Sequence, residues 1–134
     1  YGTSRLLPRL DYRLIRANPK VFVGYSDITS LHCAFLAKSN LVSFHGPMLN
    51  SDFVKSDLPD FTLQSFLRTL MHPSAPGSIC YGYRRKTVPS IRRGVAAGPL
   101  GGGNITLLCA ALATPYLPAF KNCILFFEDH DEVP

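Results

Sequence analysis

The stretch that most constrains the fold of this chain runs from Val21 to Thr29. It begins with an apolar, β-branched run that stops at Gly24, and Ser26 follows two residues later. Behind the serine, apolar residues recur at helical spacing, at Ile28, Leu31, Ala34 and Phe35. This pattern predicts a strand, a sharp turn and a helix, with Ser26 in the turn.

A serine in such a turn has two interpretations. Its hydroxyl can stand above the sheet edge, where the N–H groups that begin the helix would stabilise an oxyanion. Alternatively, Ser26 or Asp27 simply caps the helix, as these residue types often do. The segment 24–28 resembles the G-x-S-x-G nucleophile elbow, but Ile28 replaces its final glycine, which disfavours an ordinary α/β-hydrolase.

The size and composition of the chain indicate a globular protein. With 134 residues, of which 46% are hydrophobic and 17% charged, it can bury a core and is too apolar to be disordered. No apolar run approaches the roughly 20 residues that span a bilayer, and no signal segment opens the chain. The cysteines, Cys33, Cys80, Cys109 and Cys123, lie far apart without metal-binding spacing. We therefore expect buried, reduced thiols, as in a cytosolic protein.

The net charge of +5 comes visibly from a basic segment between Arg84 and Arg93. Basic patches bind nucleic acid, but few aromatic residues are interleaved here and no nucleic-acid motif accompanies them. A solvent-exposed linker surface is the favoured interpretation.

The apolar pattern predicts an α/β protein. Short helices are expected after Thr3 or Ser4 and after Asp11. Strands at 21–25 and 41–44, with a helix over 27–38 between them, would form a right-handed parallel βαβ unit with strands buried on both faces. Later elements are predicted as a helix between 52 and 73, a strand at 79–83, a glycine-rich turn at 98–104, a helix from 105 to before 115, and a buried strand at 124–127.

Shifts in composition predict the domain organisation. Residues 1–75 are expected to form part of one α/β domain, 76–93 a linker, and 94–134 the beginning of a second domain. Both ends of the sequence look cut, which suggests a fragment.

A serine nucleophile needs a base, usually a histidine. His32, on the predicted helix, is expected to pack or face solvent, and His72 lies in a loop. His45 ends the second strand and could lie near the serine, although a structural histidine is the favoured interpretation. His130, two residues past Glu128, cannot easily pair with that carboxylate while the strand stays extended.

Glu128 follows an apolar strand, where open α/β sheets place functional groups, although an exposed loop acid is the simpler interpretation. The acids after it match no EF-hand spacing, which disfavours a divalent metal. No cofactor is expected. The glycine-rich segment could bind an anion or a substrate carboxylate, but it lacks the lysine and Ser/Thr of a P-loop.

In their order, these motifs resemble the LD-carboxypeptidases (muramoyltetrapeptide carboxypeptidases). The matching segments are Tyr1-Gly2-x-x-Arg5-Leu6-Leu7, Asp11-Tyr12, Asn18-Pro19-Lys20, the Gly24-Tyr25-Ser26-Asp27 run to His32, Phe44-His45-Gly46-Pro47-Met48, Gly101-Gly102-Gly103-Asn104-Ile105-Thr106, and Ile124-Leu125-Phe126-Phe127-Glu128-Asp129. The resemblance extends over nearly the whole chain.

The resemblance implies a parallel-sheet N-terminal domain of the flavodoxin or class I glutamine amidotransferase type, followed by a second α/β domain. It also implies a metal-free, cytoplasmic serine peptidase of peptidoglycan recycling that releases terminal D-alanine from murein tetrapeptides. Ser26 matches the family's nucleophile, Glu128 matches its triad carboxylate, and the backbone N–H of Asp27 would be an oxyanion donor.

The family's triad histidine lies downstream of the carboxylate, and no position here matches it. We therefore expect the 134 residues alone to be inactive. Substrate contacts are expected at Gly2, His45 and Asn104, with a murein peptide as the partner, without nucleic acid or membrane, and with homodimerisation left open.

Other interpretations compete with this one. The nearest is a microcin-immunity-type peptidase that cleaves peptide–nucleotide conjugates. A non-catalytic member that binds murein peptides and a basic nucleic-acid binder are more distant alternatives.

Overall fold

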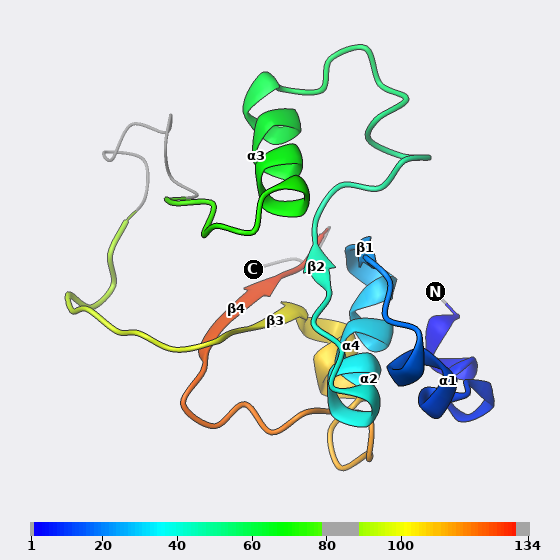
Figure 1. The fold of residues 1–134 in the computed structure, drawn as a ribbon. Helices are drawn as coiled ribbons and strands as arrows, with labels where there is room; N and C mark the ends of the chain where they lie inside the picture. The colour runs from blue at the N-terminus through cyan, green and yellow to red at the C-terminus, as the bar shows by residue number, and fades with distance from the viewer. Residues whose placement is uncertain (1, 79–88, 131–134) are drawn as a thin grey trace. The chain divides into compact units, whose positions relative to one another are not determined.

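The computed structural model describes residues 2–78 and 89–130 of the chain (Figure 1). Its contacts define two compact units, one formed by Tyr1–Gly46 with Ala97–Pro134 and the other by Pro47–Ala96. The first unit thus combines the beginning and the end of the sequence. The domain boundaries expected at residues 75 and 94 stay a prediction.

The first unit begins with short helical turns. These are η1 (Thr3–Arg5), η2 (Leu7–Arg9) and α1 (Tyr12–Ala17). The Asp11 carboxylate accepts hydrogen bonds from the Arg13 and Leu14 N–H groups at 3.0 and 2.9 Å, which confirms the expected cap. The cap expected at Thr3 or Ser4 is wrong, because Gly2 occupies the cap position of η1 without a side-chain bond.

The predicted βαβ unit is confirmed. Strand β1 (Val23–Gly24) leads through η3 (Ser26–Ile28) and α2 (Thr29–Ser39) to β2 (Phe44–His45), which pairs parallel to β1. Asn40 ends α2 in the left-handed conformation, with φ 54°. The strands are shorter than expected, and Val21 and Val42 are 64% and 70% exposed. Burial on both faces is therefore wrong at these residues, because the described β1–β2 sheet has two strands only and covers little of its own surface.

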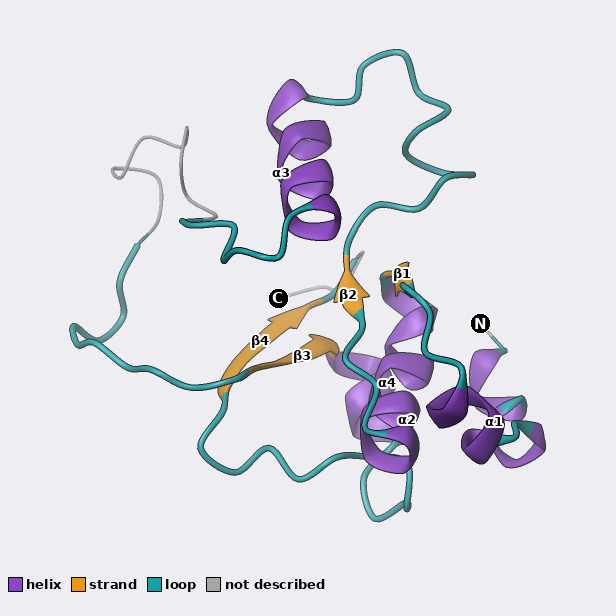
Figure 2. Ribbon diagram, viewed as in Figure 1, coloured by secondary structure: helices purple, strands orange, loops and turns teal. Residues whose placement is uncertain are grey.

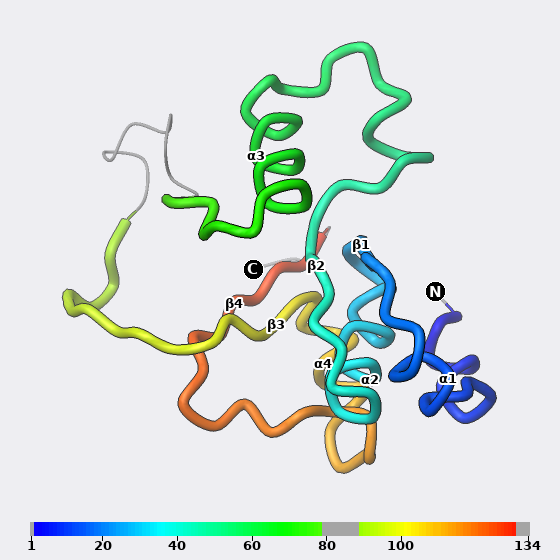
Figure 3. The backbone as a smooth tube through the Cα atoms, viewed as in Figure 1, coloured from blue at the N-terminus to red at the C-terminus, as the bar shows by residue number. Residues whose placement is uncertain are grey.

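The last part of the first unit is a second parallel pair. Strands β3 (Leu100–Asn104) and β4 (Ile124–Glu128) lie side by side in Figure 3, joined through α4 (Ile105–Ala110). The pair runs in register from Leu100 opposite Ile124 to Asn104 opposite Glu128.

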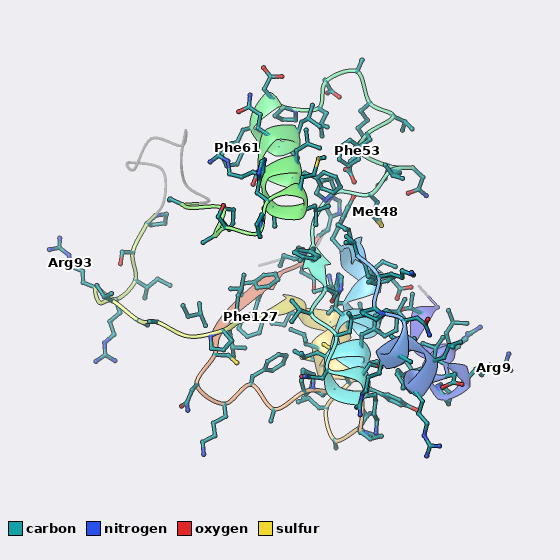
Figure 4. All side chains as sticks on the ribbon, in the orientation of Figure 1. Arg9, Met48, Phe53, Phe61, Arg93 and Phe127 are labelled. Atoms are coloured by element: carbon teal, nitrogen blue, oxygen red, sulfur yellow. The ribbon has the colours of Figure 1, made fainter. Side chains whose placement is uncertain are left out.

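Two expectations for this pair are wrong. The glycine-rich segment is a strand rather than a turn, because glycine allows a close approach: a Cβ on Gly102, at φ 137°, would lie 1.9 Å from the Phe126 carbonyl oxygen. The strand expected to be buried is largely exposed, including Phe127 at 58%, because the described sheet has only these two strands (Figure 4).

The core of the first unit gathers around α2, which packs between α1 and α4 (Figure 2). Its buried apolar side chains are Leu7, Leu31, Ala34 and Phe35. Phe22, from the segment before β1, packs edge-on against Phe35 with ring centroids 4.9 Å apart. The helix that follows the candidate serine therefore supplies three of the four buried residues of this core.

The second unit contains α3 (Asp60–Met71), which confirms the helix expected before Pro73. Phe53, on the segment before the helix, packs against Phe66 with ring centroids 4.9 Å apart (Figure 4). The strand expected at 79–83 lies outside the described residues. In the part of the chain that the structure describes, no helix has the length and apolarity to cross a bilayer.

Three of the four cysteines lie in the described residues, and their thiols are free. Cys33 is buried on α2, as expected, and burial raises its pKa to about 11. Cys109 is exposed, so the expectation of buried thiols is wrong there. Cys80 lies outside the described residues.

Candidate active site

Ser26 occupies a strained turn at the end of β1. Its φ is 59°, in the left-handed region that residues other than glycine rarely adopt, and it directly follows the extended Tyr25. Such strain costs about 1–3 kcal/mol and is concentrated at functional sites. The cap positions of η3 and α2 are occupied by Tyr25 and Ile28, neither of which makes a side-chain capping bond, so the expectation that Ser26 or Asp27 stands at the cap position is wrong.

Ile28 explains how this turn differs from the hydrolase elbow. A Cβ on the buried Gly24 would lie 2.7 Å from Cγ2 of Ile28. The isoleucine side chain thus occupies the space that a side chain at position 24 would need. Ile28, which replaces the last glycine of the motif, thus requires a glycine at position 24, because a side chain there would collide with it.

The N-terminal segment is tied to this turn. The Thr3 N–H donates to Oδ2 of Asp27 at 3.0 Å, and the Thr3 hydroxyl donates to the Asp27 carbonyl oxygen at 2.6 Å. These bonds hold the segment that begins at Gly2 against the residue after the serine. The proposed oxyanion role of the Asp27 N–H and the substrate role of Gly2 stay predictions.

His32 is a structural residue of the turn. Its Nε2 lies 2.9 Å from the Gly24 carbonyl oxygen and its Nδ1 lies 2.7 Å from the Ser43 hydroxyl. Because a carbonyl only accepts, Nε2 carries the proton and Nδ1 accepts from Ser43. Burial lowers the pKa of His32, which favours this neutral form. Both ring nitrogens are occupied, so His32 does not serve as the base for Ser26.

Glu128 ends β4 with one oxygen unsatisfied. Its Oε1 is buried and has no hydrogen-bond partner among the residues that the structure describes. A buried carboxylate oxygen without a donor is costly, and such exceptions call for an explanation. The arrangement is suited to accepting a hydrogen bond from an additional donor, such as an imidazole N–H.

His45, at the end of β2, lies on the same face of β4 as this carboxylate. Its ring packs edge-on against Phe126 with centroids 5.0 Å apart, and residues 126 and 128 of a strand share one face. The centroid of the Tyr25 ring lies 6.4 Å from that of His45. Partial burial lowers the pKa of His45, while the charge of Glu128 acts to raise it. The structure thus brings together His45, Glu128 and the residue that precedes Ser26.

Asn104 is engaged within the chain. Its Oδ1 accepts from the Leu107 N–H at 3.2 Å, which caps α4, and its Nδ2 donates to Oδ1 of Asp129 at 3.0 Å. Hydrogen bonds from the His130 N–H and the Thr106 hydroxyl are the main causes that lower the pKa of Asp129. Asn104 is 3% exposed, so its expected role in substrate binding stays a prediction that the observed bonds do not favour.

A cavity of about 420 Å³ lies beside these residues. It is mainly apolar, and its lining includes His32, His45, Gly102 and Phe126 but neither Ser26 nor Glu128. No cluster of three metal-ligating side chains occurs within residues 2–78 and 89–130.

Two family models match this chain. The LD-carboxypeptidase N-terminal domain matches residues 1–46, and the LD-carboxypeptidase C-terminal domain matches residues 97–134. These are the two segments that the structure combines in its first unit.

Individual relatives agree with the family models. The chain is 38% identical over 134 residues to the probable murein peptide carboxypeptidase of Bacillus subtilis, covering all of this chain and 41% of that protein. It is 32% identical over 151 residues to the microcin C7 self-immunity protein of Escherichia coli, covering 96% of this chain and 44% of that protein. The chain therefore spans less than half the length of these curated relatives.

The fold agrees as well. The crystal structure of muramoyltetrapeptide carboxypeptidase from Oxalobacter formigenes matches with a TM-score of 0.77 and 38% identity, over 96% of this chain and 42% of that one. This match confirms the predicted α/β class. The motifs, the two family models and the fold together show that this chain belongs to the LD-carboxypeptidase family.

Proposed function

We propose that the protein to which this chain belongs is a serine carboxypeptidase that removes the terminal D-alanine from murein tetrapeptides. One observation carries the proposal: Ser26 lies in a positive-φ turn at a strand end, within a unit that also holds a buried oxygen of Glu128 with no hydrogen-bond partner among the described residues. A strained serine and an unpaired carboxylate are two of the three parts of a serine peptidase triad. The similarity to murein peptide and muramoyltetrapeptide carboxypeptidases supports the substrate class.

In this mechanism the Ser26 hydroxyl attacks the carbonyl carbon of the L–D peptide bond. A histidine takes the hydroxyl proton and returns it to the amine of the departing D-alanine, and water then hydrolyses the acyl-enzyme. Glu128 accepts from the histidine N–H, fixes its tautomer and stabilises the imidazolium. The Asp27 N–H stabilises the tetrahedral oxyanion.

No histidine of these 134 residues is assigned to the triad. His32 is committed to Gly24 and Ser43. The resemblance to the family places the triad histidine downstream of Glu128, so the 134 residues alone are expected to be inactive. Gly2 and His45 are proposed substrate contacts, and the proposed setting is cytoplasmic recycling of peptidoglycan.

A second function is favoured by a specific observation. The similarity to the microcin C7 self-immunity protein, and to a related structure from Bacillus anthracis at 36% identity and a TM-score of 0.77, supports cleavage of peptide–nucleotide conjugates as the alternative. Both functions would use the same serine and carboxylate, so they differ only in the substrate pocket.

The test uses the product of the complete gene. It is incubated with a murein tetrapeptide, and release of D-alanine is followed by mass spectrometry for the parent, Ser26→Ala, and Ser56→Ala as an exposed serine control. We expect Ser26→Ala to lose roughly 10⁶-fold in kcat, while the control matches the parent.

A parallel arm offers a peptide–nucleotide conjugate. Serine-dependent cleavage of the conjugate alone would select the alternative function. A folded parent protein that cleaves neither substrate would contradict the proposed activity.

A further inference from the structure

Thr29 is a fully buried polar residue directly behind the candidate nucleophile. It is the first residue of α2, three positions after Ser26, and its side chain is 0% exposed. A buried hydroxyl needs hydrogen-bond partners, and in a helix these are commonly groups of its own helix. The partner of Thr29 is instead distant: its Oγ1 accepts from the Asn104 N–H at 3.0 Å, across 75 residues of sequence.

The opposite side of this contact is shaped to receive the threonine. Gly103 has φ 139°, and a Cβ there would lie 2.7 Å from both Oγ1 and Cγ2 of Thr29. Only glycine permits this approach without displacing the helix. The hydrogen bond to Asn104 and the glycine at position 103 thus lie at the same point, where α2 meets β3.

This contact connects the two candidate catalytic residues. Asn104, which donates the hydrogen bond, is the register partner of Glu128 in the β3–β4 pair. Thr29 belongs to the segment that matches the family's N-terminal domain, and Asn104 to the segment that matches its C-terminal domain. Ser26 and Glu128 are therefore connected in three steps. The chain runs three positions from Ser26 to Thr29, a hydrogen bond joins Thr29 to Asn104, and Asn104 is paired with Glu128 across the sheet.

We infer that Thr29 is a positioning residue of the active site, whose hydroxyl fixes the helix behind Ser26 against the strand pair that carries Glu128. This inference rests on the proposed function. Thr29 touches neither the substrate nor the reacting atoms. It acts by fixing the distance between Ser26 and Glu128. A misplacement of about 1 Å at a catalytic group can cost about 10²-fold in rate.

The test separates the hydroxyl from the methyl group of Thr29. Thr29→Val keeps the shape and removes the acceptor for the Asn104 N–H, whereas Thr29→Ser keeps the acceptor and removes the methyl group. In the product of the complete gene, we expect Thr29→Val to lower kcat by about 10- to 100-fold with KM within about 2-fold of the parent. We expect Thr29→Ser to melt at a lower temperature and still keep the kcat of the parent.

Thr114→Val provides the matched control. The Thr114 hydroxyl also accepts a backbone N–H, from Tyr116 at 3.3 Å, and donates to the Ala111 carbonyl oxygen at 2.6 Å. It joins neighbours in sequence rather than the nucleophile helix and the carboxylate strand. We expect a change in melting temperature without a change in kcat.

The outcomes distinguish the hypotheses. A kcat that follows melting temperature across all three variants would overturn the positioning role and leave a structural one. If Thr29→Val does not fold, a reduced kcat in Thr29→Ser would also overturn the positioning role, because that variant keeps the hydroxyl. If Ser26→Ala is as active as the parent, the proposed function itself fails, whatever Thr29 does.

Discussion

The two sides of the candidate site are held in different ways. The turn that carries Ser26 is fixed at several points: Thr3 binds Asp27, His32 binds the Gly24 carbonyl, and Thr29 binds the Asn104 N–H. The carboxylate side is the end of β4, a strand that is largely exposed, with one buried oxygen that has no partner among the described residues.

This difference agrees with what the two proposed roles require. A nucleophile turn must be rigid because its strain and its N–H groups have to be in place before the substrate arrives. A triad carboxylate has to accept from a histidine, and an oxygen that is buried and unsatisfied is suited to that bond. In the proposed assignment, the turn around Ser26 is already fixed by hydrogen bonds, whereas a buried oxygen of Glu128 can still accept a hydrogen bond from a histidine.

The largest effect is expected on the carboxylate side. Glu128→Gln keeps the shape of the side chain and removes the charge that would hold the histidine tautomer, so we expect kcat of the complete gene product to fall by roughly 10⁴-fold. The melting temperature should change little or rise, because the substitution removes a buried charge. Steady-state assays of D-alanine release and thermal melts measure both, with the exposed Asp57→Asn as control. Full activity in Glu128→Gln would remove Glu128 from the triad.

The next effect tests how closely β3 approaches β4. Gly102→Ala places a Cβ 1.9 Å from the Phe126 carbonyl oxygen, which is backbone and cannot rotate away. We expect the free energy of unfolding to fall by about 3 kcal/mol or more, at the upper end of overpacking costs. Gly94→Ala is the control, because nothing lies within 4 Å of its added Cβ. Equal denaturation midpoints for the two variants would contradict the observed pairing.

A smaller effect is expected on the nucleophile side. Gly24→Ala meets Cγ2 of Ile28 at 2.7 Å, and a side chain yields more readily than backbone, so we expect a loss of about 1–3 kcal/mol. Combining it with Ile28→Ala should recover part of that loss, which chemical denaturation of all variants in a double-mutant cycle would show. Purely additive losses would mean that the two side chains do not compete for the same space.

The smallest effect concerns pH. Burial is the main cause that lowers the pKa of His32 from its ordinary 6.5, so the unfolded chain binds the proton more readily than the folded one. The stability that comes from neutral His32 is complete above pH 6.5 and is lost as the pH falls through the lowered folded-state pKa. Burial lowers the pKa of His45 as well, so His45 adds to the same trend.

Melting temperatures between roughly pH 7.5 and pH 5 measure this effect. His32→Gln should flatten the acid side of the curve without abolishing its slope, while the exposed His72→Gln should leave the curve unchanged. An unaltered slope in His32→Gln would show that this imidazole is not the buried, neutral group described here.

Local patterns were sufficient for much of the fold. The helical spacing after Ile28, the Asp11 cap and the helix before Pro73 were all predicted correctly, because each depends on residues within a few turns of one another. The family followed from the order of short motifs. The position of Ser26 in a turn between strand and helix was also predicted, since glycine after an apolar run is a local signal.

Long-range contacts were beyond such patterns. The glycine-rich segment was expected to be a turn, but it is a strand, because its close approach to β4 depends on residues more than 20 positions away. His32 was expected to pack or face solvent, and its ring does pack against Phe22 with centroids 5.5 Å apart, but the hydrogen bonds of its two nitrogens were not predicted. A histidine on a helix gives no sign in the sequence of which carbonyl it will meet.

The sequence by itself determined the family and the α/β class, because capping, periodicity and motif order depend on neighbouring residues. Only the tertiary structure decided that Thr29 accepts from Asn104, that Asn104 caps α4, and that a buried oxygen of Glu128 has no hydrogen-bond partner among the described residues. These features depend on which backbone groups of distant segments meet, and hydrogen bonds of that kind form only once the chain has packed.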